Sequence, residues 1–253
     1  MAATHDSAVA GMFSRIARFY DPLNHLLSLG LDRHWRVVLA RRALEKGGTT
    51  ALDLAAGTLD VSLIMRRLQP EVVVAAVDFC PAMLARGRRK LRRENIRSVL
   101  PVIADAKRLP VRTDFADCLT MAFGIRNILP RHAAYAEMLR ALKPGGRACI
   151  LEFGSGRERI WGGKYNFYLE AILPRIGRMI SRDRAAYSYL AESIRAFPTA
   201  RELERELLEA GFARVWHQKL TSGVVCLHVA EKAGWSAGRA ANKLSGITQY
   251  GTL

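Results

Sequence analysis

The stretch Ala51-Leu-Asp-Leu-Ala-Ala-Gly-Thr-Leu-Asp60 decides the fold of this chain. Its apolar half predicts a buried strand, which ends in a turn of small residues and leads into a helix. The next strand ends in Ala75-Ala-Val-Asp78. At the carboxyl ends of parallel strands, a turn around Gly57 would let a ligand approach the backbone, and Asp78 could accept hydrogen bonds from two ribose hydroxyls. The pattern predicts a nucleoside-cofactor site. A plain structural turn is the alternative, because Gly57 stands alone where a complete fingerprint has two or three glycines.

Length and composition favour one large domain. The chain has 253 residues, 50% of them apolar, which suffices for an α/β domain with a substantial core. No apolar run reaches the roughly 18 residues that span a bilayer, and the opening of the chain lacks the pattern of a signal peptide. We therefore expect a cytoplasmic protein. The widely spaced cysteines indicate buried, reduced thiols and neither a disulfide framework nor a metal site: Cys80, Cys118, Cys149 and Cys226.

The chain is strongly basic. It has 39 Lys and Arg against 23 Asp and Glu, a net charge of +16, which favours an anionic partner such as a membrane surface or nucleic acid. An arginine-rich composition alone would produce the same excess. The densest run, residues 86–97, is typical of a solvated helix face whose buried side is Met83, Leu84 and Leu91. The run contains no aromatic residue that could stack on bases, which argues against nucleic acid as the partner.

The rest of the chain divides into a helical start and an alternating region. Residues 1–48 are predicted to be helical, with Asp21-Pro22 ending the first helix. Alternation of strand and helix then begins at Thr49 and implies parallel pairing with right-handed crossovers. We expect strands at 50–55, 72–78, 98–103, 116–123 and 147–153, and helices at 59–68, 81–93 and 131–142.

The C-terminal part departs from this alternation. A largely helical, aromatic and basic insertion is expected at 155–197. A capping box then opens a helix at Thr199. The last two strands, 213–218 and 222–231, are so close that they must form an antiparallel hairpin. The predicted fold is therefore an α/β, Rossmann-like, seven-stranded, mostly parallel sheet with an antiparallel terminal hairpin. It spans 49–232 and is followed by a loose tail at 233–253. This hairpin suits a methyltransferase better than a dinucleotide-binding dehydrogenase.

Several distinctive motifs are spread over about residues 12–232. They are Phe13-Ser-Arg-Ile-Ala-Arg-Phe-Tyr-Asp21 with Asn24, Asp53-Leu-Ala-Ala-Gly-Thr58, Phe123-Gly-Ile-Arg-Asn127, Leu142-Lys-Pro-Gly-Gly146, Leu151-Glu-Phe153, Leu173-Pro-Arg-Ile-Gly177, Tyr189-Leu-Ala-Glu-Ser-Ile194 and Leu220-Thr-Ser-Gly-Val-Val225. Together they resemble those of the ubiquinone/menaquinone biosynthesis C-methyltransferases. The Lys-Pro-Gly-Gly motif occurs in many methyltransferases, whereas Phe-Gly-Ile-Arg-Asn and Tyr-Leu-Ala-Glu-Ser-Ile are specific.

The resemblance implies transfer of a methyl group from S-adenosylmethionine to a ring carbon of a prenylated benzoquinol or naphthoquinol. It places Asp78 at the ribose and Asp105 with Ala106 at the adenine edge. The physical reading of Asp105 agrees, because a carboxylate at a strand end can accept from an exocyclic amine. An ordinary strand-end cap is the alternative. The whole expected cofactor set is Asp53, Gly57, Thr58, Asp78, Asp105, Ala106 and Ala122.

Methylation at carbon requires that the ring lose its phenolic proton, so the site must favour a phenolate and exclude water. Arg126 is the first catalytic candidate, since a guanidinium can stabilise a phenolate. Alternatively, it pairs with a carboxylate such as Glu152. Tyr20 and Asp21 are the other catalytic candidates. The substrate-binding candidates are Asn24, Asn127 and Tyr165. No metal is expected, and Phe13 and Phe123 are expected to be packing residues.

Two departures from the family pattern bear on activity. Leu59 replaces a usual glycine and is expected to add a side chain beside the cofactor, and Ala122 replaces a small hydroxyl residue. They motivate a second hypothesis, a catalytically impaired scaffold in a quinone-biosynthesis assembly. A third, an RNA methyltransferase, depends on charge alone. For the enzyme, the expected partners are a prenylated quinol and the anionic inner face of the membrane. The sequence leaves the oligomeric state open, a homo-oligomer included.

Overall fold

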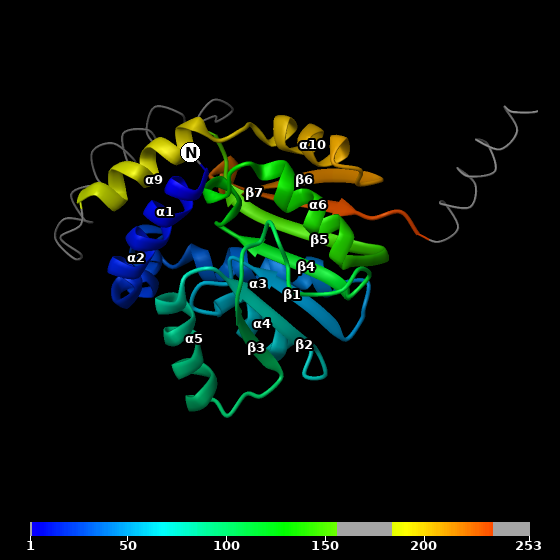
Figure 1. Cartoon of the computed structure of the whole chain (residues 1–253), viewed down its shortest axis with the longest axis horizontal. Helices are drawn as coiled ribbons and strands as arrows, with labels where there is room; N and C mark the ends of the chain where they lie inside the picture. The colour runs from blue at the N-terminus through cyan, green and yellow to red at the C-terminus, as the bar shows by residue number, and fades with distance from the viewer. Residues whose placement is uncertain (1, 156–183, 235–253) are drawn as a thin grey trace, which may run out of the picture.

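The computed structural model describes residues 2–155 and 184–234. At its centre lies a seven-stranded sheet with the order β3-β2-β1-β4-β5-β7-β6 (Figure 1). The first five strands are parallel, and β7 runs antiparallel to both β5 and β6. The predicted mostly parallel sheet with an antiparallel terminal hairpin is thus confirmed. The strands are β1 (Thr50–Leu54), β2 (Val73–Asp78), β3 (Val99–Ile103), β4 (Ala116–Ala122), β5 (Leu142–Phe153), β6 (Arg214–Leu220) and β7 (Val225–Glu231).

Helices cover both faces of this sheet. One apolar cluster joins the sheet to α3, α4 and α5, and a second joins its other face to α6 and α10. The N-terminal helices α1 and α2 lie beside α9 and α5 at one end of the sheet (Figure 1). The helices are α1 (Ala2–Ile16), α2 (Tyr20–Leu27), α3 (Leu31–Leu44), α4 (Asp60–Leu68), α5 (Pro81–Arg93), α6 (Arg131–Ala141), α9 (Arg184–Ala196) and α10 (Ala200–Glu209), with short 3-10 turns at Ala17–Phe19, Ile125–Asn127 and Thr221–Gly223.

Local sequence accounts for several of these boundaries. Proline at the first position of α5 begins that helix without losing a needed N–H donor. Thr199 and Glu202 form the predicted capping box at the start of α10. The α4 helix has no capping side chain at its own N-cap, Leu59. Instead, the carboxylate of Asp53, at the end of β1, accepts from the backbone N–H of Ser62 at 3.1 Å and from its hydroxyl at 2.6 Å.

Two predicted boundaries are wrong. The first helix ends at Ile16, and Asp21-Pro22 lies in the first turn of α2, where proline is tolerated because that N–H has no partner within the helix. Strand β5 begins at Leu142 and includes the Lys-Pro-Gly-Gly segment expected to precede it, with a register shift against β4 between Ala116 and Cys118.

Other expectations from sequence are also decided by the structure. The four cysteines are buried and free, as predicted. Met83, Leu84 and Leu91 form the buried side of α5, as predicted. Of the expected insertion at 155–197, α9 is helical, whereas residues 156–183 lie outside the described residues, as does the tail from 235. Within residues 2–155 and 184–234, none of the helices combines the length and apolar character needed to cross a bilayer.

Candidate functional site

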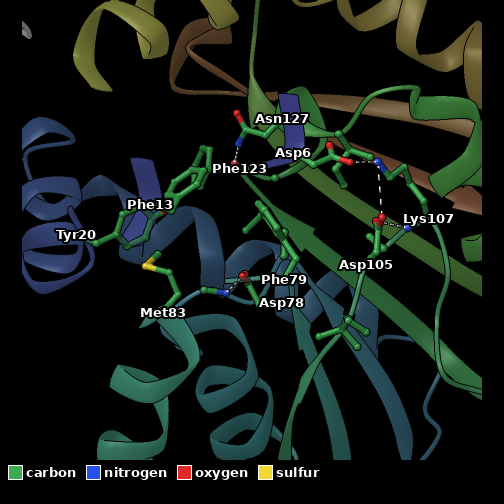
Figure 2. Close-up of a pocket in the computed structure, with 18 residues that line it drawn as sticks. Asp6, Phe13, Tyr20, Asp78, Phe79, Met83, Asp105, Lys107, Phe123 and Asn127 are labelled. Atoms are coloured by element: carbon green, nitrogen blue, oxygen red, sulfur yellow. Dashed lines mark hydrogen bonds and ion pairs between the residues drawn. The ribbon is translucent and has the colours of Figure 1, made fainter. Parts of the chain in front are cut away.

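A cavity opens at the carboxyl ends of the parallel strands, where the opening motif predicts one. It holds about 780 Å³ of empty space, part of it open to solvent, within the size range of small-molecule sites. Figure 2 shows side chains from the N-terminal helices and from the ends of β2, β3 and β4 and the loops after them facing it. The lining residues are Asp6, Phe13, Tyr20, Ala55, Gly57, Val77, Asp78, Phe79, Met83, Ala104, Asp105, Ala106, Lys107, Ala122, Phe123, Gly124, Asn127 and Ile128.

The loop after β1 is held to the end of β2 by Asp78. One carboxylate oxygen accepts from the backbone N–H of Gly57 at 2.8 Å and the other from that of Cys80 at 2.8 Å. Burial raises the pKa of Asp78, and the two backbone donors act against that rise. Each carboxylate oxygen retains a lone pair for a further donor. Gly57 has φ +54°, and a Cβ there would lie 3.4 Å from the Met83 Cε, so glycine keeps this wall open.

The loop after β3 forms another end of the cavity. Asp105 accepts from the backbone N–H of Lys107 at 2.8 Å, and about half of its side chain is exposed. The Lys107 ammonium lies 2.6 Å from a carboxylate oxygen of Asp6 on α1 and 3.6 Å from Asp105 (Figure 2). Helix α1 is therefore tied by an ion pair to the loop on which the adenine edge is expected.

The opposite wall is aromatic and amide-bearing. Phe123, at φ +58°, has its ring centroid 4.8 Å from that of Phe153 and 6.3 Å from that of Trp35. The amide oxygen of Asn127 accepts from the Tyr189 hydroxyl of α9 at 3.1 Å. Phe123 sits in a backbone conformation that a bulky residue rarely adopts, and such strain clusters at ligand sites. Phe123 therefore both packs in the core and borders the cavity.

Two guanidinium groups act electrostatically on Tyr20 of α2. Burial raises the pKa of the Tyr20 hydroxyl, whereas Arg36, Arg126 and a hydrogen bond with Asn24 lower it. Arg36 is buried, donates to the carboxylate of Asp32, and lies with its guanidinium carbon 5.4 Å from the ring centroid of Phe123. Among the described residues, Asp32 is the only hydrogen-bond acceptor of Arg36, so its remaining N–H groups have no protein acceptor there.

Arg126 is backed by a carboxylate, the alternative that the sequence left open. Its Nη1 donates to Glu152 at 2.6 Å and to the carbonyl of Phe123 at 2.7 Å. Both side chains are nearly buried, with 7% and 1% exposed. The Nε of Arg126 is buried and lacks a partner among the described residues. Arg126 lies behind the wall made by Phe123 rather than in the lining itself.

Several predicted site residues do not line the cavity but bind one another beside it. The Thr58 hydroxyl donates to Asp21 at 2.5 Å. Lys90 on α5 binds Asp21 at 2.7 Å, Asp60 at 2.5 Å and Thr58 at 3.1 Å. This cluster of Asp21, Thr58, Asp60 and Lys90, the Lys90 cluster, joins α2 to the start of α4 and to α5.

The cavity lining includes Gly57, Asp78, Asp105, Ala106 and Ala122 of the predicted cofactor set, together with Tyr20 and Asn127. Outside it lie Asp53, Thr58, Asp21, Asn24 and Arg126. Tyr165 falls outside the described residues.

Leu59 does not project into the cavity, which corrects the expectation from sequence. Its side chain is fully buried and packs on α5 against Gly87, where an added Cβ would lie 2.3 Å from the Leu59 Cγ. The backbone of Leu59 has φ +70°, in the region that favours glycine. This leucine therefore keeps the backbone conformation of the expected glycine and directs its side chain into the core.

The lining residues that were not expected from the sequence include Asp6, Phe79, Met83 and Lys107. A signal existed for Phe79, because it directly follows Asp78 at a strand end and presents an aromatic ring to the cavity (Figure 2). No local signal existed for Asp6 and Lys107, since the ion pair joins residues that are 101 positions apart.

Comparisons with known proteins agree with this architecture. The chain is 38% identical to the ubiquinone/menaquinone biosynthesis C-methyltransferase UbiE of Xylella fastidiosa, over 88% of this chain and 89% of that protein. It is 43% identical to the demethylmenaquinone methyltransferase of Mycobacterium bovis, over 89% and 93%.

A solved structure shares the fold at much lower identity. Phosphoethanolamine N-methyltransferase 2 of Haemonchus contortus, in complex with S-adenosyl-L-methionine, superposes with a TM-score of 0.57 at 14% identity, covering 77% of this chain and 52% of that one. The model of the ubiE/COQ5 methyltransferase family matches residues 1–232. The chain therefore belongs to the ubiE/COQ5 methyltransferase family.

Proposed function

We propose that this protein is an S-adenosylmethionine-dependent C-methyltransferase that methylates a ring carbon of a prenylated quinol in quinone biosynthesis. The observation that carries the proposal is the cavity in which Gly57, Asp78 and Asp105 from three neighbouring strand ends come together. The named relatives are methyltransferases of ubiquinone or menaquinone synthesis, and they match nearly the whole chain. The acceptor is a demethylated benzoquinol or naphthoquinol.

The residues present fit the nucleoside cofactor. Asp78 offers free lone pairs for ribose hydroxyls, and Gly57 leaves the backbone open beside it. Asp105 presents an accessible carboxylate for the exocyclic amine of adenine, with Ala106 beside it. Phe79 supplies an apolar surface next to Asp78 for the base (Figure 2). When bound here, S-adenosylmethionine supplies an electrophilic methyl group.

The acceptor end of the site is built around Tyr20. A phenolate oxygen held there would be stabilised at a distance by the positive charges of Arg36 and Arg126, which do not line the cavity but act on the Tyr20 hydroxyl. Both guanidinium groups are buried and backed by carboxylates, so their positions are fixed before the acceptor binds. Arg126 is the candidate that the sequence proposed, and the structure adds Arg36. Asn127 lines the cavity and would make a polar contact with a ring substituent, whereas Asn24 would act through its hydrogen bond with Tyr20.

The supporting residues receive different roles. Asp21 and Thr58 serve in the Lys90 cluster that holds α2 in place. Asp53 serves as the cap of α4, directly beneath the loop that carries Gly57. The aromatic wall around Phe123 keeps water from the reacting ring. The scaffold hypothesis is not favoured, because the Leu59 side chain on which it partly depended does not reach the cavity.

The protein would act in the cytoplasm at the inner face of the membrane, because a prenylated acceptor resides in the bilayer. The excess positive charge, +16, supports attraction to an anionic surface. Nucleic acid is not proposed as a partner. Assembly into a homo-oligomer is compatible with this function but not required by it.

The deciding experiment incubates the protein with methyl-labelled S-adenosylmethionine and a panel of demethylated benzoquinols and naphthoquinols, followed by mass spectrometry. We expect one added labelled methyl group on a ring carbon, and much less product with Asp78→Asn at the same, subsaturating cofactor concentration. Cofactor binding without a methylated quinol anywhere in the panel would refute the proposed acceptor class. Labelled RNA in a parallel reaction would support the RNA methyltransferase instead.

A further inference from the structure

Exposed apolar side chains concentrate at the turn between α2 and α3. Nine large apolar residues are exposed in the described part of the chain, and three of them fall within six positions: Leu26, Leu29 and Leu31. Leu29 is the most exposed of all, at 87%. We call these three residues the leucine turn. Single exposed apolar residues are ordinary, but a group at a turn marks an interaction site.

Two polar side chains of the same turn bind a buried carboxylate. Buried Asp32 accepts from the hydroxyl of Ser28 at 2.9 Å and from Nδ1 of His25 at 2.8 Å, and also pairs with Arg36. The N–H of Gly30 donates to the carbonyl of His25 at 2.7 Å. These hydrogen bonds hold the turn in one conformation in which the three leucines lie on its outer side.

Neither folding nor backbone preference explains Leu29. Its φ of +52° lies in the left-handed region, where glycine and asparagine are favoured. The side chain has little contact with the core to offset that strain, since most of it is exposed. A leucine at this position is therefore better explained by what lies outside the protein.

The charges around the leucine turn are positive. Arg33 is exposed two positions after Leu31, and Arg18 is exposed just before the other end of α2. Nη2 of Arg86 donates to the carbonyl of Arg18 at 3.1 Å, so the cationic side chains around α2 continue into the basic face of α5. The nearby acids are neutralised: Asp21 pairs with Lys90 at 2.7 Å, and Asp32 is buried with Arg36. An apolar tip with a cationic rim complements an anionic lipid bilayer.

We infer that the leucine turn inserts into the interfacial region of an anionic bilayer and docks α2, whose other end carries Tyr20, on the membrane. The inference rests on the proposed function, since the same helix carries Tyr20 into the cavity and a prenylated acceptor resides in the bilayer. A second copy of the chain fits this surface less well, because three leucines on a projecting turn offer much less area than the about 800 Å² that each partner buries in a stable dimer.

The test measures cosedimentation of the full chain with vesicles of phosphatidylcholine, with and without phosphatidylglycerol. We expect Leu29→Asn to weaken binding to the anionic vesicles at least tenfold. Its thermal stability should stay equal or rise, because asparagine tolerates the left-handed backbone. Leu29→Trp should retain binding, since tryptophan favours the membrane interface. Leu208→Gln, which changes a leucine 48% exposed on α10, is the matched control and should bind like the unaltered chain.

Equal binding of Leu29→Asn and the unaltered chain would overturn the inference, as would failure of the unaltered chain to bind any vesicle. A lipid-free dimer that Leu29→Asn dissociates in analytical ultracentrifugation would assign the turn to a second copy and also overturn it. Methylation of a short-tailed, water-soluble quinol, which needs no membrane, tests the proposed function independently of the docking surface. That activity should be equal in Leu29→Asn, and its absence from the unaltered chain would refute the function rather than the docking surface.

Discussion

Leu59 packs on the bare α-carbon of Gly87, so close that a Cβ on Gly87 would lie 2.3 Å from the Leu59 Cγ. Leu59 lies at the end of the loop that joins β1 to α4, and Gly87 lies in α5. The Leu59 side chain fills the space beside the Gly87 backbone, so residue 87 can carry no side chain while residue 59 is a leucine. The first prediction concerns this pair.

Gly87→Ala is expected to destabilise the protein strongly, by about 2–3 kcal/mol, because the core must overpack or Leu59 must leave its site. Leu59→Gly is expected to cost about 2 kcal/mol in unfolding free energy, since the cavity it leaves outweighs the relief of backbone strain. Combined, the two changes should cost much less than their sum. Chemical denaturation of the four proteins measures the cycle, and additive effects would contradict the packing described.

Cofactor affinity should hardly change in Leu59→Gly. The side chain faces the core and not the cavity, so calorimetric titration with S-adenosylhomocysteine should agree within about twofold with the unaltered chain. A large gain in affinity would instead support the expectation from sequence that this leucine crowds the ligand.

Asp78→Asn should weaken S-adenosylhomocysteine binding about 10-fold to 100-fold, equivalent to about 1.4–2.7 kcal/mol. The amide would bring an N–H₂ group against one of two backbone donors, Gly57 or Cys80, and would lose an acceptor for the ribose. Calorimetry measures the loss. The control is Asp114→Asn, whose carboxylate pairs with Lys232 away from the cavity. Equal losses in both variants would remove Asp78 from the cofactor site.

Arg36→Gln and Arg126→Gln should each lower kcat about 10²-fold while leaving S-adenosylhomocysteine affinity within about twofold, if both stabilise the acceptor phenolate. Each should also move the acid limb of the kcat profile to higher pH, because the phenol loses a positive neighbour. Arg131→Gln, which breaks a partly buried ion pair with Glu206 on another face, is the control. A fall in kcat without a shift in the pH profile would indicate a merely structural role.

Lys90→Met should loosen α2 without unfolding the sheet. Its ion pairs with Asp21 and Asp60 involve side chains about one quarter exposed, so the global loss should stay near 1 kcal/mol. Hydrogen exchange followed by mass spectrometry should show faster exchange in Tyr20–Leu27 and unchanged protection in β1 and β4. Lys143→Met, which removes a similar pair with Asp117, should leave α2 protected. Equal protection of α2 in both variants would argue against the Lys90 cluster as its tether.

Asp53 and His228 should give opposite slopes of stability against pH. Burial raises the pKa of Asp53 from 3.8 to about 6, so the stability it contributes is full below pH 4 and is lost as pH rises through 6. Burial lowers the pKa of His228 from 6.5 to about 4, so its contribution is full above pH 6.5 and is lost as pH falls through 4. Each effect has a ceiling of about 3 kcal/mol.

Replacing either Asp53 or His228 should therefore leave the pH dependence of stability that is due to the other. Relative to the unaltered chain, Asp53→Asn should lose more stability on acidification from pH 6.5 to 4, and His228→Gln should lose less. Glutamine keeps a donor for the carbonyl of Ala200, which the His228 Nε2 meets at 3.0 Å. Denaturation midpoints at several pH values test this, and parallel slopes in all three proteins would contradict it.

The sheet could be predicted because its signals are local. Strand periodicity around Asp53 and Asp78, and the short link before β7, fixed the order of elements before any contact was known. The direction of the Leu59 side chain could not be predicted, because a positive φ reverses where Cβ points and the receiving space comes from Gly87, 28 positions later in the numbering. The Asp6–Lys107 ion pair could not be predicted either, because nothing in the sequence indicates that two charged residues so far apart are in contact.

The packing of α1 and α2 beside the cavity also has a consequence for synthesis of the chain. Asp6 is translated 101 positions before its partner Lys107, and Asp21 is translated well before its partner Lys90. While the ribosome is still making the sheet, the apolar side of α1 and α2, including Met12 and Leu23, has no surface on which to rest. The nascent chain therefore exposes this apolar surface until β5 and α9, whose Phe153 and Ile194 belong to the same cluster, have been made. A chaperone would find a binding surface there during synthesis.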